Sequence, residues 1–184
     1  MFDSCIVLDL DETLFHSETS ITQDIKMKKE CDQSFKYMDV YYYVYYRPHL
    51  KEFIESIFKH FDHVAIWTAA DKKYATKIVN KIFTPEQKDN LLFFYSRKNC
   101  VINHKGSYTK PLGKVFIQFP FLKSKNTIIV DNVDVSKENP NMSIHIKDFY
   151  NDKKDKELLK LQPSRKINSS KILSNYKNKH SSKN

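Results

Sequence analysis

Glycine is scarce in this sequence. Only 2 of the 184 residues are glycine, Gly106 and Gly113, and the two stand apart. The phosphate loops of Walker-type and dinucleotide-binding proteins need several glycines in a short run, because their backbone turns tightly and approaches the phosphate closely. The absence of a glycine-rich loop therefore excludes these two classes of nucleotide-binding protein.

Cysteines and long apolar runs are also few. The 3 cysteines, Cys5, Cys31 and Cys100, are an odd number without the spacing of a metal site, and Cys5 lies in a predicted strand as a buried thiol. Free thiols indicate a reducing compartment, so we expect an intracellular protein, nuclear or cytoplasmic. No apolar run approaches the roughly 20 residues of a membrane span, and no signal peptide is visible. We therefore expect no membrane partner.

Aromatic residues and positive charge are what the sequence does have. With 13 Phe, 11 Tyr and 40% hydrophobic residues, the chain can bury a core, and we expect one domain over residues 1–162. Residues 151–184 contain ten Lys or Arg and three Asp or Glu, which is seven of the nine net positive charges. We expect residues 163–184 to be a basic, disordered tail. It either solubilises the chain or tethers it to nucleic acid or an acidic partner.

Two carboxylates stand one residue apart in the run CIVLDLDETL. Asp9 and Asp11 follow a short apolar segment that is typical of a buried strand. Residues two apart in a strand point to the same side, so both carboxylates can reach one small volume. There they could bind a divalent cation, or divide nucleophilic attack and proton transfer between them. By itself the pattern Asp-x-Asp-x-Thr is only moderately specific, since Asp and Thr also cap helices.

Two further apolar runs end in the same way. HVAIW at 63–67 is followed by Thr68, and NTIIV at 126–130 is followed by Asp131 and Asn132. Stretches with helical spacing lie between them, at about 49–61 and 72–83. Alternating strands and helices predict a parallel sheet covered on both faces, and such sheets bind ligands beyond the carboxyl ends of their strands. We expect Asp9, Thr68 and Asp131 to meet there.

The ordered motifs resemble a known family. DLDETL, Arg47-Pro48-His49, IWTAA, Tyr108-Thr109-Lys110 and IIVDN are similar to the haloacid dehalogenase superfamily, and within it to the small phosphatases that act on the C-terminal domain of RNA polymerase II. The resemblance runs from about Cys5 to about Lys147. It implies a Rossmannoid α/β fold without a cap domain, with a β-hairpin inserted after the first motif. It also implies a protein serine/threonine phosphatase whose substrates are phosphopeptides like that polymerase domain.

The resemblance also implies roles for individual residues. Asp9 would be the nucleophile that forms an aspartyl-phosphate, and Asp11 the general acid and base. Thr68 and Lys110 would complete the catalytic set by neutralising the phosphoryl oxygens. Phosphate or substrate contacts are expected from Thr13, Ala69, Arg97 and Tyr108. The implied cofactor is Mg²⁺, and its expected ligands and supporting groups are Asp9, the main-chain carbonyl of Asp11, Asn132 and Asp131.

Two departures from the family pattern keep alternatives open. Pro111 follows Lys110 where the family usually has Asp, and Val133 follows Asn132 where it often has Ser. Proline suits the first turn of a helix, so we expect a helix from Pro111 to about Phe119. One alternative is an inactive binding module of the same fold. Another is a phosphatase for metabolites or nucleic-acid ends.

The intervals between the motifs bear on what the site admits. Neither 13–68 nor 68–110 has room for a cap of domain size, which favours a phosphoprotein substrate over a metabolite. The aromatic run YMDVYYYVYY at 37–46 predicts a hairpin strand, some of whose rings could grip a proline-containing or aromatic peptide. Residues 17–36 are polar, and we expect a loop. Of the seven histidines, His16 is the one close enough to the first motif to be worth testing.

Overall fold

A five-stranded parallel sheet forms the centre of the structure. The computed structural model describes residues 3–162. In spatial order the strands are β10 (Ser143–His145), β9 (Thr127–Asp131), β1 (Cys5–Leu8), β5 (His63–Trp67) and β6 (Leu91–Tyr95). The central strand β1 pairs in parallel with both β5 and β9, so the first motif lies between the other two. The apolar runs predicted as buried strands are confirmed.

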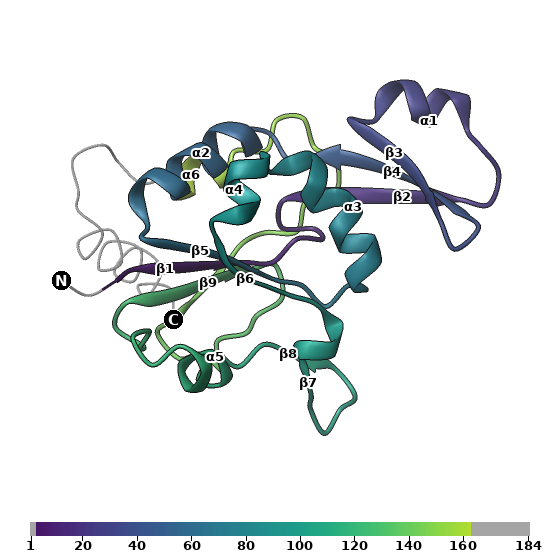
Figure 1. The fold of residues 1–184 in the computed structure, drawn as a ribbon. Coiled ribbons are helices and arrows are strands. Elements are labelled where there is room, and N and C mark those ends of the chain that lie inside the picture. Colours follow the sequence, from purple (N-terminus) through teal and green to yellow (C-terminus); the bar gives the residue numbers. More distant parts are fainter. Residues whose placement is uncertain (1–2, 163–184) are drawn as a thin grey trace.

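Helices cover both faces of this sheet, as predicted. Ile6 and Leu8 of β1 pack in one core with α2 (Leu50–His60) and α3 (Lys72–Ile82), whereas Cys5 and Val7 pack in another with α5 (Leu112–Gln118). Figure 1 shows α2, α3, α4 (Pro85–Asp89) and α6 (Glu157–Leu161) above the sheet and α5 below it. Side chains alternate across a strand, so an apolar strand needs this two-sided cover.

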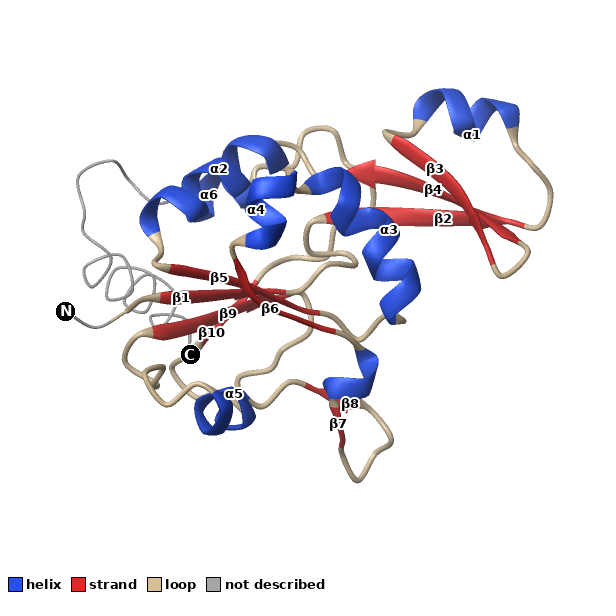
Figure 2. Ribbon diagram, in the orientation of Figure 1, coloured by secondary structure: helices blue, strands red, loops and turns tan. Residues whose placement is uncertain are grey.

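A second, antiparallel sheet is inserted directly after the first motif. It contains β2 (Phe15–Ser20), β4 (Val40–Tyr46) and β3 (Gln33–Tyr37), in that order, and α1 (Ile25–Glu30) connects β2 to β3. Figure 2 shows these strands projecting beyond the carboxyl ends of the central sheet. The predicted hairpin is confirmed as β3 and β4. Its turn residues Met38 and Asp39 both have positive φ, at 48° and 62°, as in the tight hairpin turns whose twist matches the strands.

The prediction of a loop over residues 17–36 was wrong. After Phe15 the side chains of β2 are polar and at least partly exposed, and this strand is held by its pairing with the aromatic β4, from Phe15 opposite Tyr46 to Ser20 opposite Tyr41. The short α1 buries none of its side chains and begins at Asp24, whose carboxylate accepts a hydrogen bond from the Met27 N–H. Helices and strands that bury few side chains show no regular spacing of hydrophobic residues in the sequence.

Short elements fill the later interval, and no cap domain is found within residues 3–162. After β6 come a 3-10 turn, η1 (Arg97–Asn99), and a two-stranded ribbon of β7 (Val101–Ile102) and β8 (Tyr108–Thr109). The helix predicted after Pro111 is confirmed as α5, with Pro111 at its N-cap. The expected tail, 163–184, lies outside the described residues. Among those described, each helix is too short or too polar to reach across a lipid bilayer.

Candidate active site

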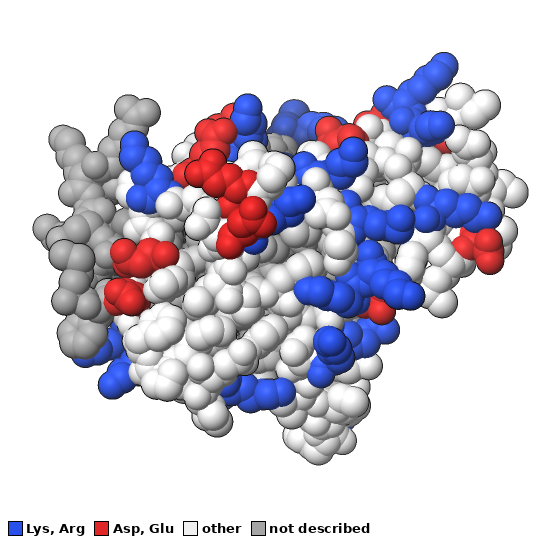
Figure 3. All heavy atoms as spheres, viewed as in Figure 1, with Lys and Arg blue, Asp and Glu red and all other residues white. Residues whose placement is uncertain are grey.

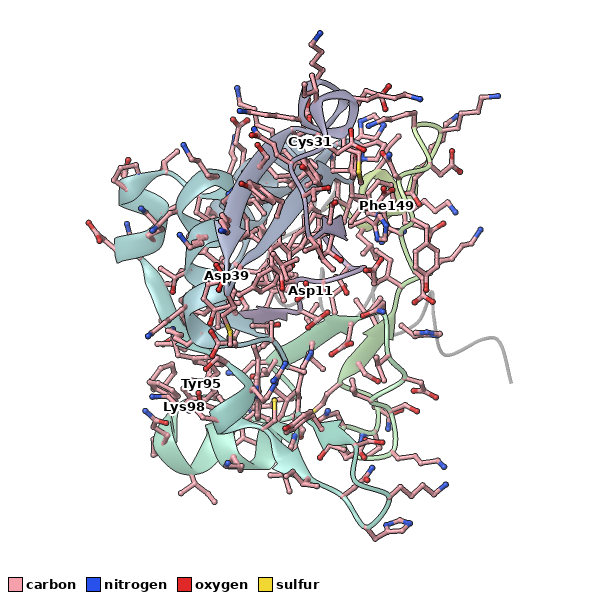
Figure 4. All side chains as sticks on the ribbon, turned by 90° about the vertical axis from the view of Figure 1, so that its right-hand side faces the viewer. Asp11, Cys31, Asp39, Tyr95, Lys98 and Phe149 are labelled. Atoms are coloured by element: carbon pink, nitrogen blue, oxygen red, sulfur yellow. The ribbon has the colours of Figure 1, made fainter. Side chains whose placement is uncertain are left out.

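Three strands bring their polar residues to one place. Asp9 follows β1, Thr68 follows β5 and Asp131 ends β9, so all three lie at the carboxyl ends of neighbouring parallel strands, as predicted. Together they line a cleft of about 600 Å³, which we call the Asp9 cleft. Figure 4 views the molecule from this side, with Asp11 near the centre. Side chains from the inserted sheet and from α3 complete the walls.

Lys110 is the cation at the base of the Asp9 cleft. Its buried ammonium donates hydrogen bonds to Asp9 and, over 2.8 Å, to Asp131 Oδ2. Burial alone would lower the pKa of Lys110, but the two carboxylates outweigh it and raise this pKa, so the side chain stays charged. The Pro111 that follows has therefore not displaced the lysine from the acids.

Asn139 binds the backbone on both sides of Pro111. Its fully buried side chain donates to the Lys110 carbonyl over 3.0 Å and accepts from the Leu112 N–H over 2.8 Å. This amide thus binds both residues that flank Pro111 and fixes the start of α5. The sequence offered no signal for Asn139, because it comes 29 residues after Lys110 in a segment without a motif.

Thr13 links the first and last motifs. Its buried hydroxyl lies 3.0 Å from Asp9 Oδ2 and 3.2 Å from Asn132 Oδ1, and it accepts the Asn132 N–H over 3.1 Å. A hydroxyl has one hydrogen to donate, so it satisfies only one of these two oxygens at a time. The Asp9 carboxylate and the Asn132 amide oxygen therefore lie close to the same hydroxyl, and at any moment one of the two lacks a hydrogen bond from it.

Asp131 and Asn132 are both held firmly. Asp131 accepts the Val133 N–H over 2.9 Å as well as the Lys110 ammonium, while Asn132 donates to Asp148 Oδ1 over 3.1 Å. Burial, followed by the charge of Asp9, raises the pKa of Asp131. The departure at position 133 leaves an exposed valine whose backbone still bonds Asp131.

Asp11 lies on the opposite wall of the cleft. Tyr74 of α3 donates to its Oδ1 over 2.8 Å, and the Thr68 hydroxyl is 3.4 Å from its Oδ2. Burial and the adjacent Asp9 raise the pKa of Asp11 to about 6. The same burial raises the pKa of Tyr74, so its phenol remains a donor. In the sequence, Tyr74 lies within the helical spacing of residues 72–83, and no motif marks it as a site residue.

The end of β5 is tied to the segment after β6. Thr68 accepts the Ala70 N–H over 3.0 Å, and Arg97 Nε donates to the Ala69 carbonyl over 2.8 Å. Thr68, Ala69 and Arg97 all line the Asp9 cleft. Tyr108 does not line it. Its ring stacks under the Arg97 guanidinium, 5.6 Å from the ring centre, and borders a neighbouring hollow instead.

His16 does not line the Asp9 cleft. Its Nδ1 lies 2.9 Å from a Glu12 carboxylate oxygen, and its ring contacts Tyr150 edge to face. Although His16 is close to the first motif in sequence, it lies beside Glu12 and contacts neither Asp9 nor Asp11.

An aromatic wall and a buried arginine have surroundings that the sequence did not predict. Tyr37 and Tyr42 of the inserted sheet line the cleft, and Tyr42 packs 5.0 Å from the ring of Tyr74. Arg47, which directly follows β4, is fully enclosed and pairs with Asp155 over 2.8 Å. The sequence marked the aromatic run and the arginine, but not which of their side chains reach the site.

A comparison with protein families identifies the chain's relatives. The family model described as "NLI interacting factor-like phosphatase" matches residues 4–175. The chain belongs to this family. It is therefore a phosphatase of the type to which the C-terminal-domain phosphatases belong, and the expected enzyme class is confirmed.

Individual relatives agree with this membership. A "CTD phosphatase-like protein 355R" of Invertebrate iridescent virus 3 is 33% identical over 174 residues, which cover 85% of this phosphatase and 92% of the viral protein. The human "CTD small phosphatase-like protein" is 32% identical over 162 residues, covering 86% of this phosphatase and 54% of the human protein. The chain thus spans about half the length of the human relative and nearly all of the viral one.

Solved structures confirm the fold. The RNA polymerase II C-terminal-domain phosphatase Fcp1 superposes with a TM-score of 0.57 at 21% identity, covering 96% of this phosphatase and 53% of Fcp1. A variant of the fission yeast Fcp1 bound to beryllium fluoride gives a TM-score of 0.59 at 15% identity, with 97% and 51% covered. The predicted haloacid-dehalogenase-like fold is therefore correct.

Proposed function

We propose that this phosphatase is an Mg²⁺-dependent protein serine/threonine phosphatase that works through an aspartyl-phosphate on Asp9. The observation that carries the proposal is the buried contact of the Lys110 ammonium with Asp9 and Asp131, beside the Thr13 bridge to Asn132. Residues from three distant segments, 9–13, 110 and 131–132, supply these groups. Phosphoryl transfer depends mainly on such positioning and on neutralisation of charge.

Two carboxylates divide the chemistry. An Asp9 oxygen attacks phosphorus, the bond from phosphorus to the serine oxygen breaks, and Asp11 gives its proton to that leaving oxygen. Water then attacks the aspartyl-phosphate, and Asp11 takes a proton from it as phosphate leaves and the Asp9 carboxylate is restored. The raised pKa of Asp11 and the donors Tyr74 and Thr68 that hold it support its assignment as the proton carrier.

Three groups hold the phosphoryl oxygens. Lys110 transfers one of its hydrogen bonds from Asp9 to the substrate, Thr68 donates from its hydroxyl, and the backbone at Ala69 lies alongside. The bond from Arg97 Nε to the Ala69 carbonyl stiffens that backbone and keeps the guanidinium at the mouth of the cleft. Charge-assisted hydrogen bonds of this kind are the strong ones in a dry site.

The donor set fits a magnesium ion. Asp9, Asp11 and Asp131 line the Asp9 cleft, and the Lys110 ammonium contacts two of them, Asp9 and Asp131. Thr13 cannot donate to Asp9 and Asn132 at the same time. Asp9, the main-chain carbonyl of Asp11 and Asn132 would hold the ion, and Asp131 would support it from behind. These are oxygen ligands of the kind that Mg²⁺ prefers. When bound, the ion would neutralise charge on the phosphoryl oxygens.

A phosphopeptide is the substrate that the cleft favours. Without a cap, an extended segment of protein can cross the open cleft, and Tyr37 and Tyr42 offer it an aromatic wall of the kind that binds proline-containing peptides. The names of the relatives indicate peptides like the C-terminal domain of RNA polymerase II. An intracellular location, nuclear or cytoplasmic, suits that substrate.

One set of assays tests this proposal. Turnover of an aryl phosphate is measured with added Mg²⁺ and again with a chelator, and we expect activity only with the metal. The kcat/KM for phosphoserine peptides is then compared with that for nucleotide 3′-phosphates. Faster hydrolysis of the nucleotides would favour the nucleic-acid-end reading, and full activity in the chelator would contradict the magnesium requirement.

A further inference from the structure

A second hollow lies beside the Asp9 cleft. It measures about 440 Å³, opens between the start of α3, η1 and β8, and shares Asp71 and Arg97 with the cleft. The remaining side chains that line it are Lys72, Ser96, Lys98, Cys100, Ile102 and Tyr108. We call it the Lys98 hollow. Figure 4 shows Lys98 to the lower left of Asp11, on the same side of the molecule. A peptide that crosses the cleft past Arg97 would meet this hollow next.

The Lys98 hollow has an excess of positive charge. Lys72, Arg97 and Lys98 line it against a single carboxylate, Asp71. That carboxylate is already engaged, because it accepts the Tyr37 hydroxyl over 2.6 Å and caps the N-terminus of α3. Figure 3 shows a band of Lys and Arg side chains over α3 and the segment after β6. The local charge therefore favours an anionic ligand.

The cations differ in how far they are already used. Arg97 is anchored by the hydrogen bond from Nε and lies over the ring of Tyr108, and within residues 3–162 its terminal nitrogens have no hydrogen-bond partner. The Lys98 ammonium likewise has no hydrogen bond or ion pair in that range. Lys72 donates to the Phe94 carbonyl over 2.7 Å. Burial, and then the charge of Lys98, lowers the pKa of Lys72, so these two cations repel each other and an anion between them would relieve the repulsion.

Building on the proposed phosphatase function, we propose that the Lys98 hollow binds a second anionic group on the substrate peptide, next to the phosphoserine that is hydrolysed. A planar, pre-oriented arginine beside a lysine suits phosphate or carboxylate oxygens. The exposed faces of Tyr108 and Ile102, 43% and 63% accessible, would pack against the intervening peptide. The enzyme would then select doubly phosphorylated or acidic segments over singly phosphorylated neutral ones.

A binding experiment tests this independently of turnover. Fluorescent peptides of one sequence carry a single phosphoserine, a second phosphoserine or a glutamate, with the second group moved one residue at a time on either side. Their affinities are measured for the Asp9→Asn chain. At one spacing we expect the second phosphate to tighten binding about tenfold, the worth of one charge-assisted hydrogen bond, and the glutamate to tighten it less. Lys98→Glu should remove the gain.

Lys59→Glu is the matched control, because it changes the net charge equally on the exposed last turn of α2 and should keep the tenfold gain. A gain that survives Lys98→Glu, or no gain at any spacing, would overturn the proposal. The proposal would also be overturned if 3′-phosphorylated oligonucleotides bound more tightly than every peptide and Lys98→Glu abolished that binding. Aryl phosphate turnover by the unchanged chain reports separately on the proposed function.

Discussion

The Asp9 cleft and the inserted sheet beside it are built in opposite ways. The charged groups of the cleft are almost wholly enclosed, with Asp9, Lys110 and Asp131 each no more than 5% exposed, and each is bound to a residue from another strand or loop. The inserted sheet is one layer with few buried side chains, and its helix α1 buries none. The groups to which we assign the chemistry thus sit on the rigid core, and the surface proposed to meet a substrate lies on a thinner, more adaptable layer.

The two regions meet at a few named contacts. Tyr74 of the core packs against Tyr42 of the inserted sheet and also donates to Asp11, and Ser17 of β2 hydrogen-bonds the same phenol over 3.0 Å. Arg47 directly follows β4, the last strand of the inserted sheet in the sequence, and joins that end of the sheet to the core. We therefore expect substitutions in the core to change the rate of the chemical step, and substitutions in the insertion to change how peptides bind.

The largest effect is expected from Asp9→Asn. The amide is nearly the same size but cannot act as the nucleophile, so kcat should fall by at least about 10⁴-fold. Stability should not fall, because the change removes a carboxylate that repels both Asp11 and Asp131 and leaves the pair of Lys110 with Asp131. The kcat for an aryl phosphate and the thermal unfolding midpoint check both halves. Retained turnover would remove Asp9 from the mechanism.

A smaller loss is expected from Asp11→Asn. General acid catalysis contributes about 10²- to 10⁴-fold, and that factor should be lost for a phosphopeptide, whose serine oxygen is a poor leaving group. An aryl phosphate leaves without a proton, so its first step should lose much less. A burst of phenol release followed by slow turnover would reveal the aspartyl-phosphate waiting for its base. Equal losses for the two substrates would argue against the acid.

Arg47→Ala should reduce stability by about 3 kcal/mol, since it leaves the shielded Asp155 without its partner. The arginine also donates to the Thr13 and Lys147 carbonyls over 2.9 and 2.7 Å, and so joins the inserted sheet to the first motif. Chemical denaturation measures the loss. Arg47→Lys keeps the charge but cannot reach all these acceptors, so it should restore only part of the stability.

This pair also sets a pH dependence. Partial burial raises the pKa of Asp155, but the hydrogen bonds from Arg47 and from the Glu157 N–H outweigh this effect and hold the pKa below its usual value. A lowered folded-state pKa stabilises the protein above the unfolded-state pKa of about 4, and the contribution is lost as the pH falls through the folded value. The stability difference between the wild type and Asp155→Asn should therefore shrink between pH 5 and about pH 2.

The core was readable from sequence because its signals are local. Short apolar runs that end in Asp9, Thr68 and Asp131 define strands and site together, and parallel strands bring their ends to one edge. Asn139 and Arg47 could not be assigned in that way, since their partners are far along the chain and are set by packing. The inserted sheet was partly missed because β2 is polar and is stabilised by pairing with β4. A polar strand that pairs with an apolar strand shows no regular spacing of hydrophobic residues in its own sequence.

The smallest effect separates the two regions most clearly. Tyr42→Ala removes an aromatic wall of the Asp9 cleft that contacts Tyr74 but none of the charged groups. We expect KM for a proline-containing phosphopeptide to rise about tenfold, the worth of one buried aromatic contact, with kcat changed less than about threefold. An aryl phosphate is too small to contact Tyr42, so its kcat/KM should not change. A comparable loss for the aryl phosphate would mean that Tyr42 acts through Tyr74 on Asp11, and the division between a chemical core and a substrate-selecting layer would then fail at this contact.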